Sequence, residues 1–179
     1  MSSRDARGLP VVHTTLTQDP VVTGRAAVPY VGTRRTVTMT TMADIADRIP
    51  EVVGWVLENG HAPAGAPFLR YLVIDMEREL VVEAGIPVDG PVEAAGEVYA
   101  GTLPAGRYAT VVHTGHPDDL VGATGDLLRW AEREGLAFDA SPGPDGEVWG
   151  CRLENYLTDP REEPDMDRWE TELAFRLAD

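Results

Sequence analysis

The chain has 179 residues, with 30 acidic and 15 basic side chains, and its formal charge is −15. This length corresponds to one domain or two very small ones, and a hydrophobic content of 43% predicts a packed core. The negative charge disfavours nucleic acids and anionic membranes as direct partners, because both attract basic surfaces. All 15 basic residues are arginines, which excludes lysine-dependent chemistry such as Schiff-base formation.

Cysteine usage and the N-terminal sequence favour a cytoplasmic protein. A single cysteine, Cys151, excludes an intramolecular disulfide bond. Residues 1–10 contain charged side chains and are not followed by an apolar run, so they do not resemble a signal peptide. The histidines lack the spacing of a metal site, and no dinucleotide-binding fingerprint is present, so we expect neither a metal ion nor a cofactor.

The first half of the chain predicts a strand, a helix and two further strands. After an N-terminal arm over residues 1–20, alternating β-branched residues predict strand material over 21–39, with a bulge or turn near Tyr30. Apolar residues at helical spacing follow as far as Leu57, and Asn59-Gly60 is a typical helix end. Because proline is disfavoured inside helices, we expect the main helix to begin at Pro50, after a separate lead-in. Residues 68–75 and 80–88 predict the two strands.

The second half repeats this order after an acidic linker over residues 89–96. Residues 98–114 predict strand, interrupted by a turn at 104–106, and residues 118–135 predict a helix. Two more strands are expected over 148–158 and 171–177.

The two halves, 21–88 and 97–179, can be aligned with each other. The segment from Trp55 to Gly60 matches the segment from Trp130 to Gly135, and Tyr71 matches Tyr156 after a longer loop in the second half. Neither half is large enough to build a full core alone. We therefore predict an α/β (α+β) fold in which a strand-helix-strand-strand unit is duplicated about a pseudo-twofold axis, with an antiparallel sheet and a central ligand cleft.

Strand alternation predicts which side chains face this cleft. Arg152, Glu154 and Tyr156 share one face of their strand, and the opposite face holds Trp149, Cys151 and Leu153. We expect helices to cover the second face and the first face to meet its counterpart from the other half, formed by Leu69, Tyr71 and Val73. The alternative is that Glu154 pairs with a neighbouring arginine on an exposed sheet face, and that the tyrosines pack across strands.

Four segments of the chain resemble one known family. They are Gly65-Ala-Pro-Phe-Leu-Arg-Tyr71, Leu103-Pro-Ala-Gly-Arg-Tyr108, Glu154-Asn-Tyr-Leu-Thr-Asp-Pro160 and Trp169-Glu-Thr-Glu-Leu173. In order and spacing they are similar to the GyrI-like small-molecule-binding domain, the effector-binding module also found in AraC- and MerR-type regulators. The resemblance covers residues 21–179, and the segment before it is too short for a helix-turn-helix, as in a stand-alone form.

The resemblance implies a cleft that binds hydrophobic, cationic aromatic small molecules. By motif position Glu154 would face the cation, because a carboxylate among aromatic rings suits a delocalised positive charge. The resemblance places Tyr71, Tyr156 and Trp169 around it. The remaining candidate ligand contacts are Phe68, Leu69, Tyr108 and Trp130.

The resemblance leaves two alternative functions open. Some GyrI-like proteins hydrolyse reactive electrophiles such as cyclopropane-bearing natural products, and Glu154 would then orient or deprotonate water with Tyr71 or Tyr156 as proton donor. Another family member inhibits DNA gyrase, so an acidic interaction protein, with a gyrase or a separate regulator as partner, is the second alternative.

Overall fold

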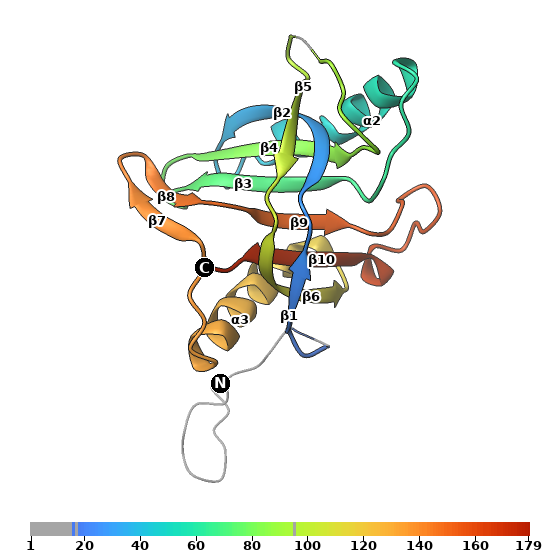
Figure 1. Ribbon diagram of the computed structural model, residues 1–179. Helices are drawn as coiled ribbons and strands as arrows, with labels where there is room; N and C mark the ends of the chain where they lie inside the picture. Colours follow the sequence, from blue (N-terminus) through green and yellow to red (C-terminus); the bar gives the residue numbers. More distant parts are fainter. Residues whose placement is uncertain (1–15, 17, 95) are drawn as a thin grey trace, which may run out of the picture.

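A single antiparallel sheet organises the computed structural model, which describes residues 16, 18–94 and 96–179. Most of the expected N-terminal arm therefore lies outside the described residues. The strands are β1 (Val21–Arg25), β2 (Val28–Val37), β3 (Phe68–Ile74), β4 (Leu80–Pro87), β5 (Tyr99–Leu103), β6 (Gly106–Thr114), β7 (Ala140–Gly143), β8 (Gly146–Trp149), β9 (Arg152–Tyr156) and β10 (Glu170–Arg176). As Figure 1 shows, both ends of the sheet curl toward the same side.

The order of the strands confirms the predicted duplication. It runs β1-β6-β10-β9-β3-β4-β2-β5, with the β7-β8 hairpin attached to β3. Read from either end, the order places equivalent strands of the two halves at equivalent positions, and β3 and β9 meet in the middle. Each half also lends a strand to the other, because β1 pairs with β6 and β5 pairs with β2.

Local sequence signals determine where the helices begin and end. A short helix α1 (Ala43–Ala46) precedes α2 (Ile49–Glu58), which has Pro50 in its first turn as expected. The 3₁₀ turn η1 (Pro117–Asp119) leads into α3 (Leu120–Arg133), and a second turn η2 (Met166–Arg168) precedes β10. Both α2 and α3 end at a left-handed glycine, Gly60 with φ 76° and Gly135 with φ 70°.

Each face of the sheet carries its own core. The helix face is covered by α1 and α3, whose buried residues include Ile45 and Leu127, and it contains Leu69 and Phe175. The opposite face, which we call the closed face, is enclosed by the curling ends of the sheet. Its buried residues are Tyr30, Phe68, Leu103, Tyr108, Cys151, Leu153 and Ala174.

A buried polar network ties the closed face together. The Glu83 side chain, 1% exposed, accepts hydrogen bonds of 2.9 Å from the Tyr30 hydroxyl and a further one from the Tyr99 hydroxyl. The Arg70 guanidinium lies 3.5 Å from the same carboxylate and also donates to the Gly150 carbonyl at 2.9 Å. The network thus links β2, β3, β4 and β5, and it fixes the backbone just before β9.

Three local predictions were wrong. The helices cover the face of β9 that carries Arg152 and Glu154, whereas Cys151 and Leu153 face the closed side. The first interruption falls at residues 26–27, between β1 and β2, and Tyr30 lies inside β2. The single strand expected over residues 148–158 is divided at residues 150–151 into β8 and β9.

Among the described residues, no helix is long and apolar enough to cross a membrane.

Candidate functional site

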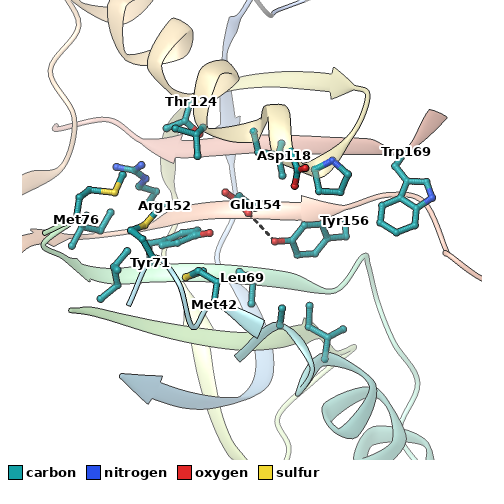
Figure 2. A pocket seen from close by; sticks show the side chains of 18 residues that line it. Met42, Leu69, Tyr71, Met76, Asp118, Thr124, Arg152, Glu154, Tyr156 and Trp169 are labelled. Atoms are coloured by element: carbon teal, nitrogen blue, oxygen red, sulfur yellow. Dashed lines mark hydrogen bonds between the residues drawn. The ribbon is translucent and has the colours of Figure 1, made fainter. Parts of the chain in front are cut away.

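A pocket of about 610 Å³ lies on the helix face, above the junction of β3 and β9. Its floor comes from β3, β4 and β9, and its walls come from the α1–α2 segment on one side and η1 with α3 on the other (Figure 2). The lining residues are Met39, Met42, Ala46, Ile49, Leu69, Tyr71, Ile74, Met76, Leu80, Pro117, Asp118, Leu120, Val121, Thr124, Arg152, Glu154, Tyr156 and Trp169. Both halves of the duplicated fold therefore contribute to one cavity.

The pseudo-twofold axis passes through the floor of the pocket. Leu69 and Glu154 face each other across the β3–β9 pair, and the sequence interval between them is the same as that between Tyr71 and Tyr156. The two tyrosines are thus equivalent by the pseudo-symmetry. Glu154 is equivalent to Leu69, so a carboxylate stands where the other half has an apolar side chain.

The Glu154 carboxylate is partly buried and is held by two tyrosines. The Tyr156 hydroxyl donates a 2.7 Å hydrogen bond to Oε2, and the Tyr71 hydroxyl is a second donor. Burial raises the pKa of Glu154 above its ordinary value of 4.5, although the two hydrogen bonds and the nearby Arg152 act in the opposite direction. Burial also raises the pKa of both tyrosines, so their hydroxyls stay protonated as donors.

Arg152 lies two residues before Glu154 and is held by aromatic rings. Its guanidinium carbon is 4.7 Å from the ring centroids of Trp149 and Phe175 and 5.8 Å from that of Tyr71. Cation–π contacts of this kind stabilise a buried arginine. Among the described residues, no direct ion pair joins Arg152 to Glu154. The carboxylate therefore has no salt-bridge partner among the described residues, although Arg152 still favours its ionised form through space.

Trp169 closes one end of the pocket. Its indole Nε1 donates a 2.8 Å hydrogen bond to the Glu163 carbonyl, and its own carbonyl accepts one of 2.9 Å from the Gly115 backbone. The acidic segment before β10 therefore positions this ring. The opposite end in Figure 2 carries Met76 and Arg152.

Three of the five methionines, Met39, Met42 and Met76, line the pocket. Methionine is flexible and polarizable, and it can adapt to aromatic ligands of different shape. Nothing in the spacing of these methionines marked them as ligand contacts. Met42 belonged to the predicted helical stripe, and the other two lie outside regular elements.

The structure brings together five of the eight candidate ligand contacts. Glu154, Tyr71, Tyr156, Trp169 and Leu69 all line the pocket. The other three do not line it. Phe68 and Tyr108 are fully buried on the closed face, where the Tyr108 hydroxyl donates to the Pro104 carbonyl, and Trp130 packs against the helix-face core from α3.

The register of two strands explains further differences from the sequence prediction. A shift between Tyr71 and Val73 in the β3–β4 ladder places Ile74 in the pocket, where Val73 was expected. Residues 150–151 interrupt the ladder between β8 and β9, so Trp149 packs in the helix-face core together with Arg152. Strict alternation had assigned these two side chains to opposite faces.

The pocket combines an apolar enclosure with few polar groups. Within the described part of the chain, no group of three or more His, Cys, Asp or Glu side chains could hold a metal ion. The chemistry available in the pocket is the Glu154 carboxylate with two hydroxyl donors, one guanidinium and a set of aromatic and thioether surfaces. The walls add the exposed Asp118 carboxylate and the Thr124 hydroxyl. Such a site can select a ligand by charge and shape, and it can move a proton at Glu154.

The chain belongs to the family of GyrI-like small molecule binding domains, whose sequence model it matches over residues 18–178. The fold predicted from the sequence is thereby confirmed, as is the resemblance that suggested it. No curated protein matches the chain in sequence.

Solved structures share the fold at low sequence identity. The EcmrR C-terminal domain superposes with a TM-score of 0.76 at 19% identity, over 91% of this chain and 99% of that one. In the EcmrR–DNA complex the match spans 57% of the EcmrR chain. SAV2435 bound to tetraphenylphosphonium gives a TM-score of 0.57 at 10% identity, over 90% and 94% of the two chains. A hydrolase from Listeria innocua gives 0.57 at 12% identity, over 91% and 93%.

Proposed function

We propose that this domain binds hydrophobic, cationic aromatic small molecules in the pocket, with Glu154 as the counter-ion. The observation that carries the proposal is the placement of one carboxylate at the centre of an apolar floor, between two tyrosines and without an arginine in ion-pair contact among the residues described. The similarly folded SAV2435 has been seen with tetraphenylphosphonium, which is a cation of this class.

The energetics of the pocket favour a delocalised cation over a compact one. A large aromatic cation loses little hydration on entering, whereas the buried carboxylate gains an opposite charge in a medium where the attraction is stronger than in water. The rings of Tyr71, Tyr156 and Trp169 add cation–π contacts of about 0.5–2 kcal/mol. The methionines supply the apolar contact area and adapt to the ligand's outline.

A fluorescence titration with rhodamine 6G, a cationic dye, tests the proposal. The Glu154→Gln variant keeps the shape of the side chain and one oxygen that can accept a hydrogen bond from Tyr156, but it removes the charge. We expect its dissociation constant to rise at least tenfold, or about 1.4 kcal/mol. Glu170→Gln, which removes the same charge from an exposed position on β10, is the matched control and should bind like the wild type. Equal affinities of the wild type and Glu154→Gln would overturn the proposal.

A second candidate function, hydrolysis of a reactive electrophile, is favoured by the proton chemistry of Glu154. A carboxyl group whose pKa is raised by burial is suited to accept a proton near neutral pH. In cyclopropane opening, Glu154 would take a proton from water as the water oxygen bonds to the strained carbon. The ring C–C bond would break in the same step, and its electron pair would pass to the conjugated carbonyl oxygen, which a tyrosine hydroxyl would protonate. The fold neighbours include a Listeria innocua protein described as a hydrolase.

Multiple-turnover product formation distinguishes the two functions. A cyclopropane-bearing electrophile in excess over the protein is converted repeatedly if the domain is an enzyme, and Glu154→Gln should then abolish the conversion. Binding without product beyond one equivalent would leave ligand capture as the function of the site.

A further inference from the structure

Arg152 carries hydrogen-bonding capacity that the protein itself does not use. The side chain is only 7% exposed and lines the pocket, yet its guanidinium makes no hydrogen bond to any described residue. Its contacts are with the three aromatic rings of Trp149, Phe175 and Tyr71. None of its nitrogen atoms is among the fully buried unpaired atoms of the described residues, so these N–H groups remain accessible to a molecule in the pocket.

Two other largely buried arginines show the usual pattern. Arg70, 14% exposed, donates to the Gly150 carbonyl and the Tyr30 hydroxyl and faces Glu83. Arg176, 15% exposed, pairs with Asp139 at 2.8 Å and donates to the Ala105 carbonyl at 3.0 Å. Both donate hydrogen bonds to the protein, although Nε of Arg70 has no partner, whereas the guanidinium of Arg152 contacts only aromatic rings among the described residues.

The carboxylates nearest Arg152 are engaged elsewhere. Glu154 accepts from two tyrosines, and the Glu147 Oε1 accepts a 2.6 Å hydrogen bond from the Trp149 indole. Both still act on Arg152 through space, together with the Tyr71 hydroxyl. Arginine remains protonated even when buried, so the pocket contains a cation and an acid two residues apart on one strand face.

We propose that Arg152 binds an acceptor oxygen of the ligand, above all a carboxylate, so that the pocket selects aromatic molecules carrying both a cationic group and an acidic one. This inference rests on the proposed function and deepens it by naming the class of ligand. Two residues along a strand separate the two anchors by about 7 Å. The cationic and acidic groups of the ligand would then lie about 7 Å apart along β9. Because Glu154 and Arg152 carry opposite charges, they would fix the orientation of the ligand.

The geometry favours a carboxylate over other groups. The aromatic rings around the guanidinium accept no N–H···O hydrogen bond from it, and its planar fork with two parallel donors matches the two oxygens of a carboxylate. The flanking rings also lower the local dielectric constant, which strengthens charge-assisted hydrogen bonds. A ligand bearing only positive charge would leave these donors unpaired.

A matched pair of dyes tests the inference. Rhodamine 110 carries a free carboxylate, and rhodamine 123 is its methyl ester with the same cationic ring system. We expect the wild type to prefer rhodamine 110 by at least tenfold. Arg152→Met, which preserves an apolar stem among the rings but removes the donors, should lose this preference. Arg152→Lys, which keeps the charge without the planar fork, should retain only part of it.

A second probe separates this inference from the proposed function. The 2-naphthoate anion has no cationic group, so calorimetric titration with it tests the acceptor site at Arg152 without any attraction between the probe and Glu154. Its binding should weaken at least tenfold in Arg152→Met and strengthen in Glu154→Gln, because the like charge is removed. The affinity for rhodamine 6G should instead fall in Glu154→Gln.

The outcomes can be read independently. If rhodamine 6G binding is indifferent to Glu154 while naphthoate binding depends on Arg152, the proposed function fails and the acceptor site stands. If both the naphthoate affinity and the rhodamine 110 preference are unchanged in Arg152→Met, Arg152 is a structural cation and the inference is overturned. Should Arg152→Met fail to fold by circular dichroism, the wild-type dye preference and the Arg152→Lys variant decide the question.

Discussion

At the scale of single residues, Glu154 is a compromise between stability and recognition. Burial disfavours its charged form, while Tyr156 and Tyr71 favour it. A raised pKa in the folded protein means that the native state binds a proton more readily than the unfolded chain does. The stabilising effect of protonation is therefore present at low pH and is lost as the pH rises through the folded-state value.

Binding of a cation should have the opposite pH dependence. The ionised carboxylate is the form that attracts the ligand, so the affinity for rhodamine 6G should rise as Glu154 loses its proton. Because burial raises the pKa of Glu154, this rise should occur above the ordinary value of 4.5. Dissociation constants measured from about pH 5 to about pH 8 check the prediction, since an ordinary glutamate is largely ionised throughout that range.

The same variant provides the control for this experiment. Glu154→Gln should bind the dye weakly and with little pH dependence, and it should be more stable than the wild type at neutral pH because an ionised buried group has been removed. A wild-type affinity that is constant across the range would show that Glu154 titrates at its ordinary value. A rise that persists in Glu154→Gln would assign it to another group.

At the scale of the elements, glycines permit the close packing of the closed face. A Cβ atom on Gly85 of β4 would lie 2.6 Å from Cζ of Phe68 and 3.0 Å from the Val31 carbonyl oxygen. The Phe68 ring is completely buried and has no room to move away. We expect Gly85→Ala to lower the free energy of unfolding by about 1–3 kcal/mol, the usual cost of overpacking a core. Urea denaturation measures this change.

Gly54 in α2 offers a matched substitution with the opposite expected sign. A Cβ atom at this position meets nothing within 4 Å, and alanine is a better helix former than glycine by about 0.5–1 kcal/mol. Gly54→Ala should therefore stabilise the protein slightly. If Gly85→Ala were as stable as the wild type, the packing of Phe68 against β4 would be looser than the structure describes.

The helices and strands were largely predictable from the sequence. It was harder to predict which face of a strand the helices cover. Helical spacing, Pro50 and the glycine caps predicted α2 and α3 nearly to the residue, because these signals are local. The face of β9 that the helices cover was predicted wrongly. Both faces of this sheet are buried, one by helices and one by its own curling, so hydrophobic alternation alone did not distinguish them.

Part of the candidate site was predictable from the sequence and part was not. The internal repeat and the family motifs pointed to Glu154, Tyr71 and Tyr156, which lie close together because the repeat places them about the pseudo-twofold axis. Phe68 shares a motif with Leu69 and Tyr71, and Tyr108 belongs to another of the family motifs, but both side chains are buried on the closed face. The methionines reach the pocket from loops and from the start of α1, where their position depends on tertiary packing.

At the scale of the whole molecule, duplication creates the site. Two equivalent halves join at β3 and β9 (Figure 1). The pocket above this junction is lined by helical residues of both halves. Exchange of β1 and β5 between the halves ties them together at the far ends of the sheet. The pocket therefore depends on the complete domain, and its one acidic floor residue breaks a symmetry that would otherwise leave the floor apolar.

The net charge of −15 acts on ligands over a longer distance than Glu154 does. Such a field raises the local concentration of cations around the whole protein, and salt screens it over about 30 Å at 0.01 M but only about 10 Å at 0.1 M. We expect the affinity for rhodamine 6G to fall as sodium chloride is increased across this range. Rhodamine 110, which is nearly neutral overall, should respond less.

Glu154→Gln separates the two electrostatic contributions. The variant removes one charge and leaves a net charge of about −14, so the distant field is almost unchanged. Its affinity should be lower at every salt concentration while its dependence on salt stays close to that of the wild type. If the salt dependence disappeared together with Glu154, the attraction would come from this one carboxylate, and the acidic surface would play no part in collecting the ligand.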